Sequence, residues 1–193
     1  MKKLICIGLQ KTGTSSFTEA AKILGFKPAI HGGAEKYNKP DLQLYAEGET
    51  NKIVDTLSKY NSMSDVPGAL VWRELYEKHP NSYFILTTRS SPEKWWTSVY
   101  NHYSSKDPDH ECRHEYSSYV LYGIWRLNKG YKDKCISVYN KHNEEIRNFF
   151  KNKNNFTEIC IDTDNKWEKL CGLLNMRIPK KPYPHKNKTK HRR

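Results

Sequence analysis

Residues 5–16 contain the side chains of this chain that are best placed to bind an anion. An apolar run leads into Gly8, and Gly13 follows five residues later with Thr14 directly behind it. A glycine turn between a strand and a helix presents backbone N–H groups and a helix N-terminus to one anion, typically a phosphate. Nucleotide-hydrolysing P-loops share this glycine spacing but place Lys directly after the second Gly, where this chain has Thr14. The lysine of this loop is Lys11, two residues before Gly13, so it meets an anion from a different position.

A second anion contact is predicted at the end of another strand. Arg89 follows the apolar segment 82–88, and Ser91 and Pro92 then have the residue types that cap and begin a helix. The arginine side chain binds phosphate through two parallel hydrogen bonds. Ser98, about two turns into that helix, can add a hydroxyl group. A strand-end arginine alone indicates no function, but together with the first loop it predicts a site for a ligand with two anionic groups.

These residues have to be positioned by strands that end at one edge of a sheet. Strands are expected at residues 3–7, 27–30, 82–88 and 156–161, and helices at 15–24, 41–60 in one or two pieces, 69–78, 92–103, 117–127, 136–150 and 166–174. This alternation predicts an α/β fold of three layers, with a central parallel sheet and helices on both faces. Ligands of such sheets gather at the carboxyl ends of the strands. With no internal repeat and no clear linker, residues 1–193 are predicted to form one domain.

Composition narrows the class of protein. The chain has 33 basic and 21 acidic residues, and residues 180–193 include seven Lys or Arg and no acid. A basic tail of this kind binds nucleic acid, remains solvated, or closes over a polyanionic ligand. The five cysteines have no C-x-x-C spacing, so we expect reduced thiols in a cytoplasmic protein. The chain enters a strand too early for a signal peptide and lacks an apolar run of ~18–20 residues, so no membrane association is expected.

Several segments together resemble the compact P-loop sulfotransferases. They are Lys11-x-Gly13-Thr14, Asp65-x-Pro67, Trp72-x-Glu74-Leu75-Tyr76, His79-Pro80, Arg89 with Ser98, Tyr139-x-x-His142-Asn143-Glu144, Trp167-Glu168-Lys169-Leu170-Cys171 and Pro184-His185-Lys186-Asn187. The resemblance spans residues 5–188 and implies a three-layer α/β fold of the P-loop NTPase type. It also implies 3′-phosphoadenosine-5′-phosphosulfate (PAPS) as donor, PAP as product and no metal. The reaction implied is transfer of a sulfuryl group to a hydroxyl or amine of a small-molecule, glycan or peptide acceptor.

The resemblance also implies roles for individual residues. The loop residues would hold the 5′-phosphate and the sulfate, with Lys11 stabilising the leaving phosphate: Gln10, Lys11, Thr12, Gly13, Thr14, Ser15 and Ser16. Arg89 and Ser98 would hold the 3′-phosphate, and Lys186 and Lys188 would either close over it or stay in a solvated tail. The family usually has Arg-Asp-Pro, whereas this chain has Arg89-Ser90-Ser91-Pro92, one residue longer. Thr97 is therefore the alternative to Ser98.

The residue that takes the acceptor's proton is sought after the second strand. His31 precedes the turn Gly32-Gly33, and an imidazole suits proton abstraction near neutral pH. Asp65 is the second candidate, either orienting His31 or the acceptor or serving as the base itself, and Glu35 is the third. The ordinary alternatives are a solvated loop histidine and a turn aspartate before Pro67.

Two other functions are compatible with parts of the sequence. A P-loop nucleotide or small-molecule kinase would need the Lys that is missing after Gly13 and a Mg²⁺-binding Asp at a strand end, for which Asp162 is the nearest candidate. A basic module for nucleic acid or other polyanions would need a broad patch rather than two strand-end anchors, so no nucleic-acid partner is expected. Residues 32–64 and 104–130 are expected to form the acceptor wall, and the sequence does not indicate an oligomeric state.

Overall fold

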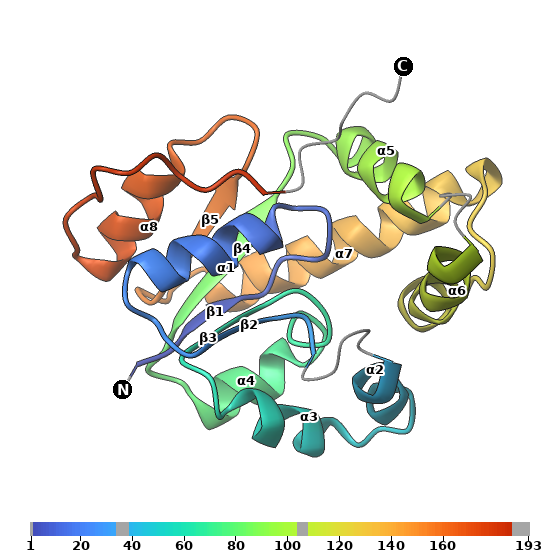
Figure 1. Ribbon diagram of the computed structural model, residues 1–193, viewed down its shortest axis with the longest axis horizontal. Helices are drawn as coiled ribbons and strands as arrows, with labels where there is room; N and C mark the ends of the chain where they lie inside the picture. Colours follow the sequence, from blue (N-terminus) through green and yellow to red (C-terminus); the bar gives the residue numbers. More distant parts are fainter. Residues whose placement is uncertain (1, 34–38, 104–107, 187–193) are drawn as a thin grey trace.

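The computed structural model describes residues 2–33, 39–103 and 108–186, with the backbone alone described at residues 39 and 108–114. Within these ranges, five parallel strands form the central sheet in the order β2-β3-β1-β4-β5 (Figure 1). They are β1 (Leu4–Cys6), β2 (Ala29–His31), β3 (Ser62–Ser64), β4 (Tyr83–Thr88) and β5 (Phe156–Cys160). The predicted α/β fold with a parallel central sheet is confirmed.

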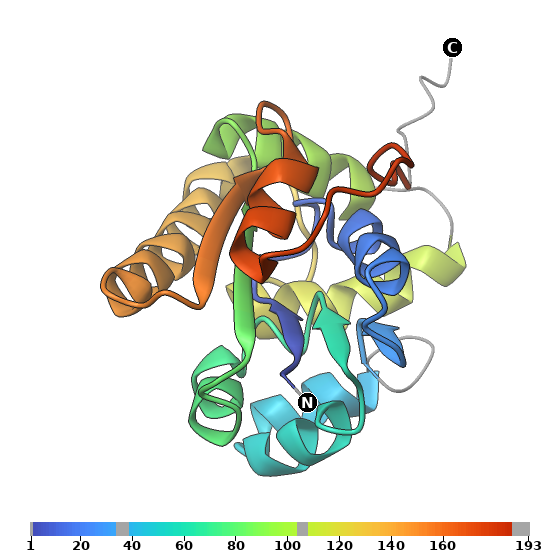
Figure 2. The same cartoon turned by 90° about the vertical axis from the view of Figure 1, so that its left-hand side faces the viewer.

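Helices cover both faces of this sheet and also extend beyond its carboxyl edge (Figures 1 and 2). They are α1 (Thr14–Ile23), α2 (Lys39–Ala46), α3 (Thr50–Leu57), α4 (Trp72–Lys78), α5 (Pro92–Tyr103), α6 (Pro108–Tyr122), the short 3₁₀ helix η1 (Lys129–Tyr131), α7 (Lys132–Phe150) and α8 (Lys166–Leu174). The helices α1 and α8 pack on one face, and α3, α4 and α7 pack on the other. Since α5 and α6 pack with α7 around the loops that follow β1 and β3, they bound the space at the carboxyl edge.

Successive side chains of a strand point to opposite faces of the sheet, and this explains why a core lies on each face. Leu4 and Cys6 of β1 face the cluster formed with α1 and α8, whereas Ile5 faces the cluster formed with α3, α4 and α7. All three side chains are fully buried, and burial of one aliphatic side chain stabilises a fold by about 1.5–3 kcal/mol. A strand buried on both faces has no polar side, so the sequence of β1 reads as one continuous apolar run.

The structure differs from the prediction most clearly at one strand and one helix. The strand β3 was not predicted, because Ser62-Met63-Ser64 has no apolar run, yet it pairs with β1 on one side and β2 on the other. The helix predicted at residues 117–127 begins earlier, at Pro108, and ends at Tyr122. Gly123 ends it, because this residue has a φ of 65°, a left-handed conformation that glycine adopts readily.

The connection after α8 returns across the sheet to α1. The indole N–H of Trp167 donates to the Lys181 carbonyl over 2.8 Å, and Tyr183 packs against the Trp167 ring. The Lys186 N–H then donates to Ser16 Oγ over 3.0 Å. The beginning of the basic tail is thereby fixed beside the first turn of α1. Within the described residues, none of the helices has the length and apolar character needed to cross a bilayer.

Candidate active site

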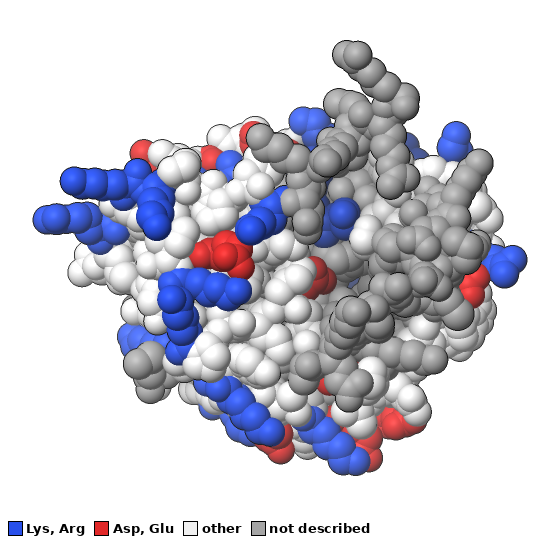
Figure 3. All heavy atoms as spheres, in the orientation of Figure 1, with Lys and Arg blue, Asp and Glu red and all other residues white. Residues whose placement is uncertain are grey.

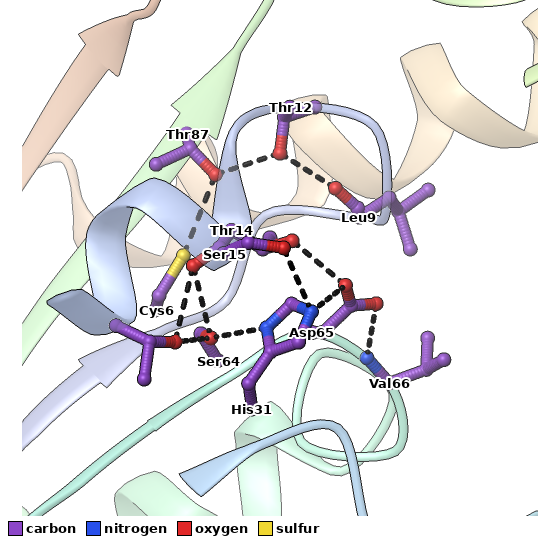
Figure 4. A network of polar contacts seen from close by, with 11 residues as sticks. Cys6, Leu9, Thr12, Thr14, Ser15, His31, Ser64, Asp65, Val66 and Thr87 are labelled. Carbon is purple, nitrogen blue, oxygen red and sulfur yellow. Dashed lines mark hydrogen bonds and ion pairs between the residues drawn. The ribbon is translucent and has the colours of Figure 1, made fainter. Parts of the chain in front are cut away.

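The loop after β1 is pressed against the end of β4. A Cβ atom at Gly8 would lie 2.2 Å from Thr87 Oγ1 and 2.4 Å from the Thr87 carbonyl oxygen, so only glycine fits there. The Thr12 hydroxyl lies 2.6 Å from the Leu9 carbonyl oxygen, to which it donates, and 2.7 Å from Thr87 Oγ1 (Figure 4). Thr12 is completely buried. Its side chain therefore fixes the shape of the loop, and its backbone is the part left for a ligand.

Two residues of this loop have left-handed backbone conformations. Lys11 has a φ of 68° and Gly13, the residue before α1, has a φ of 87°. A non-glycine residue in this region costs roughly 1–2 kcal/mol, and such strain persists mainly where the surroundings impose it. Among the described residues, no side chain caps α1 at Gly13. The first N–H groups of a helix have no acceptor within the helix, so this end of α1 is suited to face an anion.

The ammonium group of Lys11 belongs to the same loop. Burial lowers its pKa below the ordinary lysine value, and the nearby Asp65 carboxylate opposes this, while the Arg89 guanidinium adds to it. The lysine is thus a half-buried cation close to the charged groups of Asp65 and Arg89. A cation in such surroundings interacts more strongly with an incoming anion than one in bulk water.

Arg89 lies directly after β4, at the same edge of the sheet. Its backbone N–H donates to the Tyr139 hydroxyl over 3.0 Å, and its Nη1 lies 3.5 Å from the Lys11 carbonyl oxygen. Its Nε donates to both carboxylate oxygens of Asp162, at 2.9 and 3.2 Å. Burial opposes ionisation of Asp162, but the hydrogen bonds from Arg89 and from the Ser90 N–H prevail and lower its pKa to about 2. Arg89 is therefore held beside the loop by a partner that the sequence did not identify.

His31 and Asp65 lie side by side against the start of α1 (Figure 4). The Nε2 of His31 lies 3.4 Å from Asp65 Oδ2 and 3.0 Å from Ser15 Oγ, and its Nδ1 lies 3.1 Å from Ser64 Oγ. The Thr14 hydroxyl donates to Asp65 Oδ2 over 2.7 Å. The two predicted candidates for the base are thus one contacting pair, joined to the loop by two of its hydroxyl groups.

The unpredicted strand β3 orients this pair. Ser64, its last residue, is buried and lies 2.6 Å from Thr18 Oγ1 of α1 as well as against His31. Asp65 follows with a φ of 71° and accepts the Val66 N–H through Oδ1 over 2.8 Å. Aspartate tolerates this conformation better than most residues. The turn directs the Asp65 carboxylate towards α1, where Thr14 and His31 lie.

The other residues predicted for the site do not all turn their side chains towards the loop. The side chain of Gln10 points to the hydroxyls of Tyr103 and Tyr122, so its backbone is the part next to the loop. Ser16 Oγ accepts the Lys186 N–H, so Lys186 does approach α1. Ser98 lies half-buried on α5. The remaining predictions, Glu35 and Lys188, lie outside the described residues.

The alternative to Ser98 is Thr97, whose exposed hydroxyl donates to the Glu93 carbonyl oxygen over 2.9 Å within α5. That contact satisfies the hydroxyl locally, as is common for threonine within a helix. Neither hydroxyl is among the hydrogen-bond partners that the structure gives to Arg89, which are Tyr139, Lys11 and Asp162.

Gln10, Tyr103 and Tyr122 form a polar cluster between the loop and the helices α5 and α6. The Gln10 side-chain amide donates to both tyrosine hydroxyls, and the Trp95 indole N–H donates to the Gln10 carbonyl over 3.1 Å. Burial, and to a smaller extent the charge of Asp65, raise the pKa of both tyrosines. Both phenols therefore stay neutral at physiological pH and lie within the electrostatic reach of the His31–Asp65 pair.

The charges of the described residues do not form a metal site. No group of three or more His, Cys, Asp or Glu side chains within these residues is arranged to hold a metal ion. On the face shown in Figure 3, Lys and Arg side chains lie along the left and lower margins as well as near the upper edge, with acidic side chains between them. On this face the basic side chains therefore do not form one continuous basic stripe.

Comparison with known proteins identifies the family. Residues 3–192 match the family model described as the sulfotransferase domain. The chain belongs to the sulfotransferase family. It is also similar to Ava biosynthesis cluster protein M of Aspergillus versicolor, with 25% identity over 212 residues that cover 95% of this chain and 80% of that protein. The predicted family membership is confirmed, and the loop, Arg89 and the His31–Asp65 pair are the parts of this sulfotransferase domain where its geometry suits anion binding and proton transfer.

Several residues of the site gave no signal in the sequence. Thr87 appears there as one more β-branched residue of a strand, and Ser64 lies in a segment without an apolar pattern. Tyr139 was noted only as part of the resemblance, and Asp162 only as a weak metal candidate. Each of these residues contacts a partner at least 33 positions away in the sequence, so no local motif could reveal the contact.

Proposed function

We propose that this protein transfers the sulfuryl group of PAPS to a hydroxyl or amine of an acceptor. The observation that carries the proposal is the junction of β1 and α1. There Lys11 and Gly13 turn the chain into an uncapped helix N-terminus, directly beside Arg89 at the end of β4. A loop with open N–H groups and a cation, next to an arginine, suits a ligand with a phosphosulfate at one end and a phosphate at the other.

The residues present fit this donor. A Cβ at Gly13 would approach Ile161 Cγ2 to 3.0 Å, so the loop after β5 packs closely behind the cradle. PAPS supplies an activated sulfuryl group bound to a phosphate. The backbone N–H groups of residues 12–16 bind the oxygens of that group, and the Ser15 hydroxyl adds a donor at the start of α1. Arg89 binds the 3′-phosphate through its terminal nitrogens.

Lys11 stabilises the charge that develops when the sulfur–oxygen bond breaks. It lies two residues before Gly13, close enough to Arg89 for their charges to interact. Because the charge on that oxygen grows only as the bond breaks, the ammonium group contributes mainly to the transition state. Partial burial strengthens this interaction, since less water screens the charge.

His31 accepts the proton of the acceptor group, and Asp65 stabilises the imidazolium that forms. This assignment is supported by the 3.4 Å separation of Nε2 and Oδ2 and by the Ser64 hydroxyl that holds the other ring nitrogen. The His31 side chain is 39% exposed, against 15% for Asp65, so the imidazole is more accessible to an acceptor. We place the acceptor at the exposed edge of the His31 imidazole, and it is a small molecule, a glycan or a peptide.

Two rival functions have less support. A kinase would need Mg²⁺, but Asp162, the nearest sequence candidate for a Mg²⁺ ligand, is bound to Arg89 and to the Ser90 N–H. A nucleic-acid module would not need the strained loop or the His31–Asp65 pair.

The described cysteines Cys6, Cys135, Cys160 and Cys171 are free thiols, which supports the cytoplasmic location that we propose.

Calorimetry with PAP in excess EDTA tests the proposal. We expect PAP to bind without metal, and, in separate titrations without EDTA, ATP–Mg²⁺ and a single-stranded oligonucleotide to bind much more weakly. Binding of ATP–Mg²⁺ without binding of PAP would refute the proposal in favour of a kinase. A screen with radiolabelled PAPS against alcohols, phenols, amines, glycans and peptides then identifies the acceptor class.

A further inference from the structure

The guanidinium of Arg89 already has an anionic partner in this protein. Asp162 accepts from Arg89 Nε through both of its oxygens, and Asp162 Oδ2 also accepts the Ser90 N–H over 2.8 Å. Both side chains are about four-fifths buried, with exposed fractions of 19% for Arg89 and 20% for Asp162. This ion pair is more shielded from water than an ordinary surface pair, so its charges act on each other and on a ligand with less screening.

The position of Asp162 is fixed by the sheet. Thr88 of β4 pairs with Cys160 of β5, and the Ile161 N–H donates to the Thr88 carbonyl over 3.0 Å, which extends the ladder by one residue. Ile161 also packs against Gly13 in the loop. Because Asp162 follows directly, its carboxylate is placed beside Arg89 by backbone contacts and not only by attraction between the two charges.

This arrangement has opposite consequences for the two parts of the arginine. Asp162 occupies the Nε edge of the guanidinium. The terminal nitrogen Nη1 makes a long contact, 3.5 Å, with the Lys11 carbonyl oxygen. A phosphate can therefore still reach the terminal nitrogens, but it then lies close to a second anion. The carboxylate offsets part of the positive charge of Arg89 that would otherwise attract a 3′-phosphate.

We propose that Asp162 is a specificity-determining residue that limits how strongly this site prefers a nucleotide with a 3′-phosphate over the same nucleotide with a 3′-hydroxyl. The proposal rests on the function proposed above, because it assumes that Arg89 faces the 3′ position of the donor. The alternative is that Asp162 only holds Arg89 in place, and that it favours the binding of the 3′-phosphate by doing so. The two roles predict opposite changes in affinity when the charge of Asp162 is removed.

Asp162→Asn separates these roles. The amide oxygen of Asn can still accept from Arg89 Nε or the Ser90 N–H, so the geometry is kept while the negative charge is lost. We expect this variant to bind PAP about tenfold more tightly, which corresponds to about 1.4 kcal/mol. Its affinity for adenosine 5′-monophosphate, which lacks only the 3′-phosphate of PAP, should change less than about threefold. The measurement is calorimetry in EDTA at constant ionic strength.

Asp164→Asn is the matched control. Asp164 belongs to the same loop, but its carboxylate accepts the Cys160 N–H and pairs with Lys169 over 2.8 Å instead of contacting Arg89. Removing this charge should alter the affinity for PAP less than about twofold, since charges beyond the immediate contact are screened. An equal gain in both variants would show an effect of net charge alone and would overturn the proposal.

Two further outcomes overturn the inference in distinguishable ways. If wild-type protein prefers PAP over adenosine 5′-monophosphate but Asp162→Asn binds PAP equally well or more weakly, the proposed function stands and Asp162 is a positioning residue. If wild-type protein and Asp162→Asn both fail to distinguish PAP from the monophosphate, Arg89 does not face a 3′-phosphate. In that case the donor site proposed above is refuted together with the inference.

Discussion

Replacement of Asp65 by Asn tests the proposed proton transfer most directly. Asn has nearly the same shape and can keep the hydrogen bond from the Val66 N–H, while its amide can still contact Thr14 Oγ1. The change therefore removes the charge and leaves the turn in place. What is lost is the carboxylate 3.4 Å from His31 Nε2, where the positive charge appears when the imidazole takes a proton.

The geometry gives the size of the effect. At 3.4 Å and an effective dielectric constant of 20, two unit charges interact by about 5 kcal/mol. The His31 side chain is 39% exposed, so solvent screening reduces this to about 1 kcal/mol. A loss of that size in the transition state lowers turnover about fivefold. His31→Ala removes the base itself and should lower turnover by about 10²–10⁴.

The assay is steady-state turnover with radiolabelled PAPS, together with calorimetric binding of PAP to each variant. Because Asp65 acts through His31 in this mechanism, the double variant should be no slower than His31→Ala alone. Affinity for PAP should be unchanged or slightly higher, since a carboxylate near the anion site is lost. If Asp65→Asn is the slower single variant and His31→Ala retains turnover, Asp65 is the base. If the two losses add fully in the double variant, the residues do not act as a pair.

Three further predictions concern the donor loop and its support. Arg89→Ala should weaken the binding of PAP roughly ten- to a hundred-fold and the binding of adenosine 5′-phosphosulfate much less. Equal losses of affinity for both ligands in calorimetry would place Arg89 away from the 3′-phosphate. Lys11→Ala should lower kcat far more than it raises KM. Burial lowers the pKa of Lys11, so its ammonium group loses its charge at a lower pH than free lysine does, and the rate should fall on the alkaline side of the pH profile. Lys11→Arg should move this fall in rate to higher pH. A fall at the same pH in the variant would contradict the role of the Lys11 charge. Gly8→Ala should cost more than about 3 kcal/mol of unfolding free energy in a denaturant titration, and Thr87→Ala should not rescue it, because the Thr87 carbonyl oxygen also lies 2.4 Å from the added carbon.

The sequence alone determined those parts of the protein whose signals are local. The apolar run of β1, the glycine turn and the hydroxyl-rich start of α1 lie within about a dozen residues. The helix α8 was predicted at residues 166–174, and the structure has it at the same residues, with the Asn165 side chain accepting the Glu168 N–H at its start. The parallel sheet followed from the alternation of strands and helices, since parallel strands require such crossovers.

Elements without a local signal required the tertiary structure. The strand β3 has two serines in three residues, and it is a strand because β1 and β2 supply backbone partners on both sides. Ser64 is tolerated at this depth because its hydroxyl contacts Thr18 and His31, which come from two other elements, whereas the buried Ser62 hydroxyl has no hydrogen-bond partner among the described residues. Propensity describes what a segment prefers alone, and here pairing on both edges outweighs it.

The same division applies to the candidate site. The sequence placed Lys11, His31 and Arg89 after predicted strands, whose carboxyl ends meet at one edge of a parallel sheet. It placed Asp65 only in a turn before Pro67. Only the fold decided that His31 and Asp65 touch each other, that Gln10 turns its side chain to two tyrosines, and that Asp162 reaches Arg89 across 73 positions. Such contacts depend on side-chain directions and on the register of neighbouring strands, and these are set by packing of the whole chain rather than by the residues nearby in sequence.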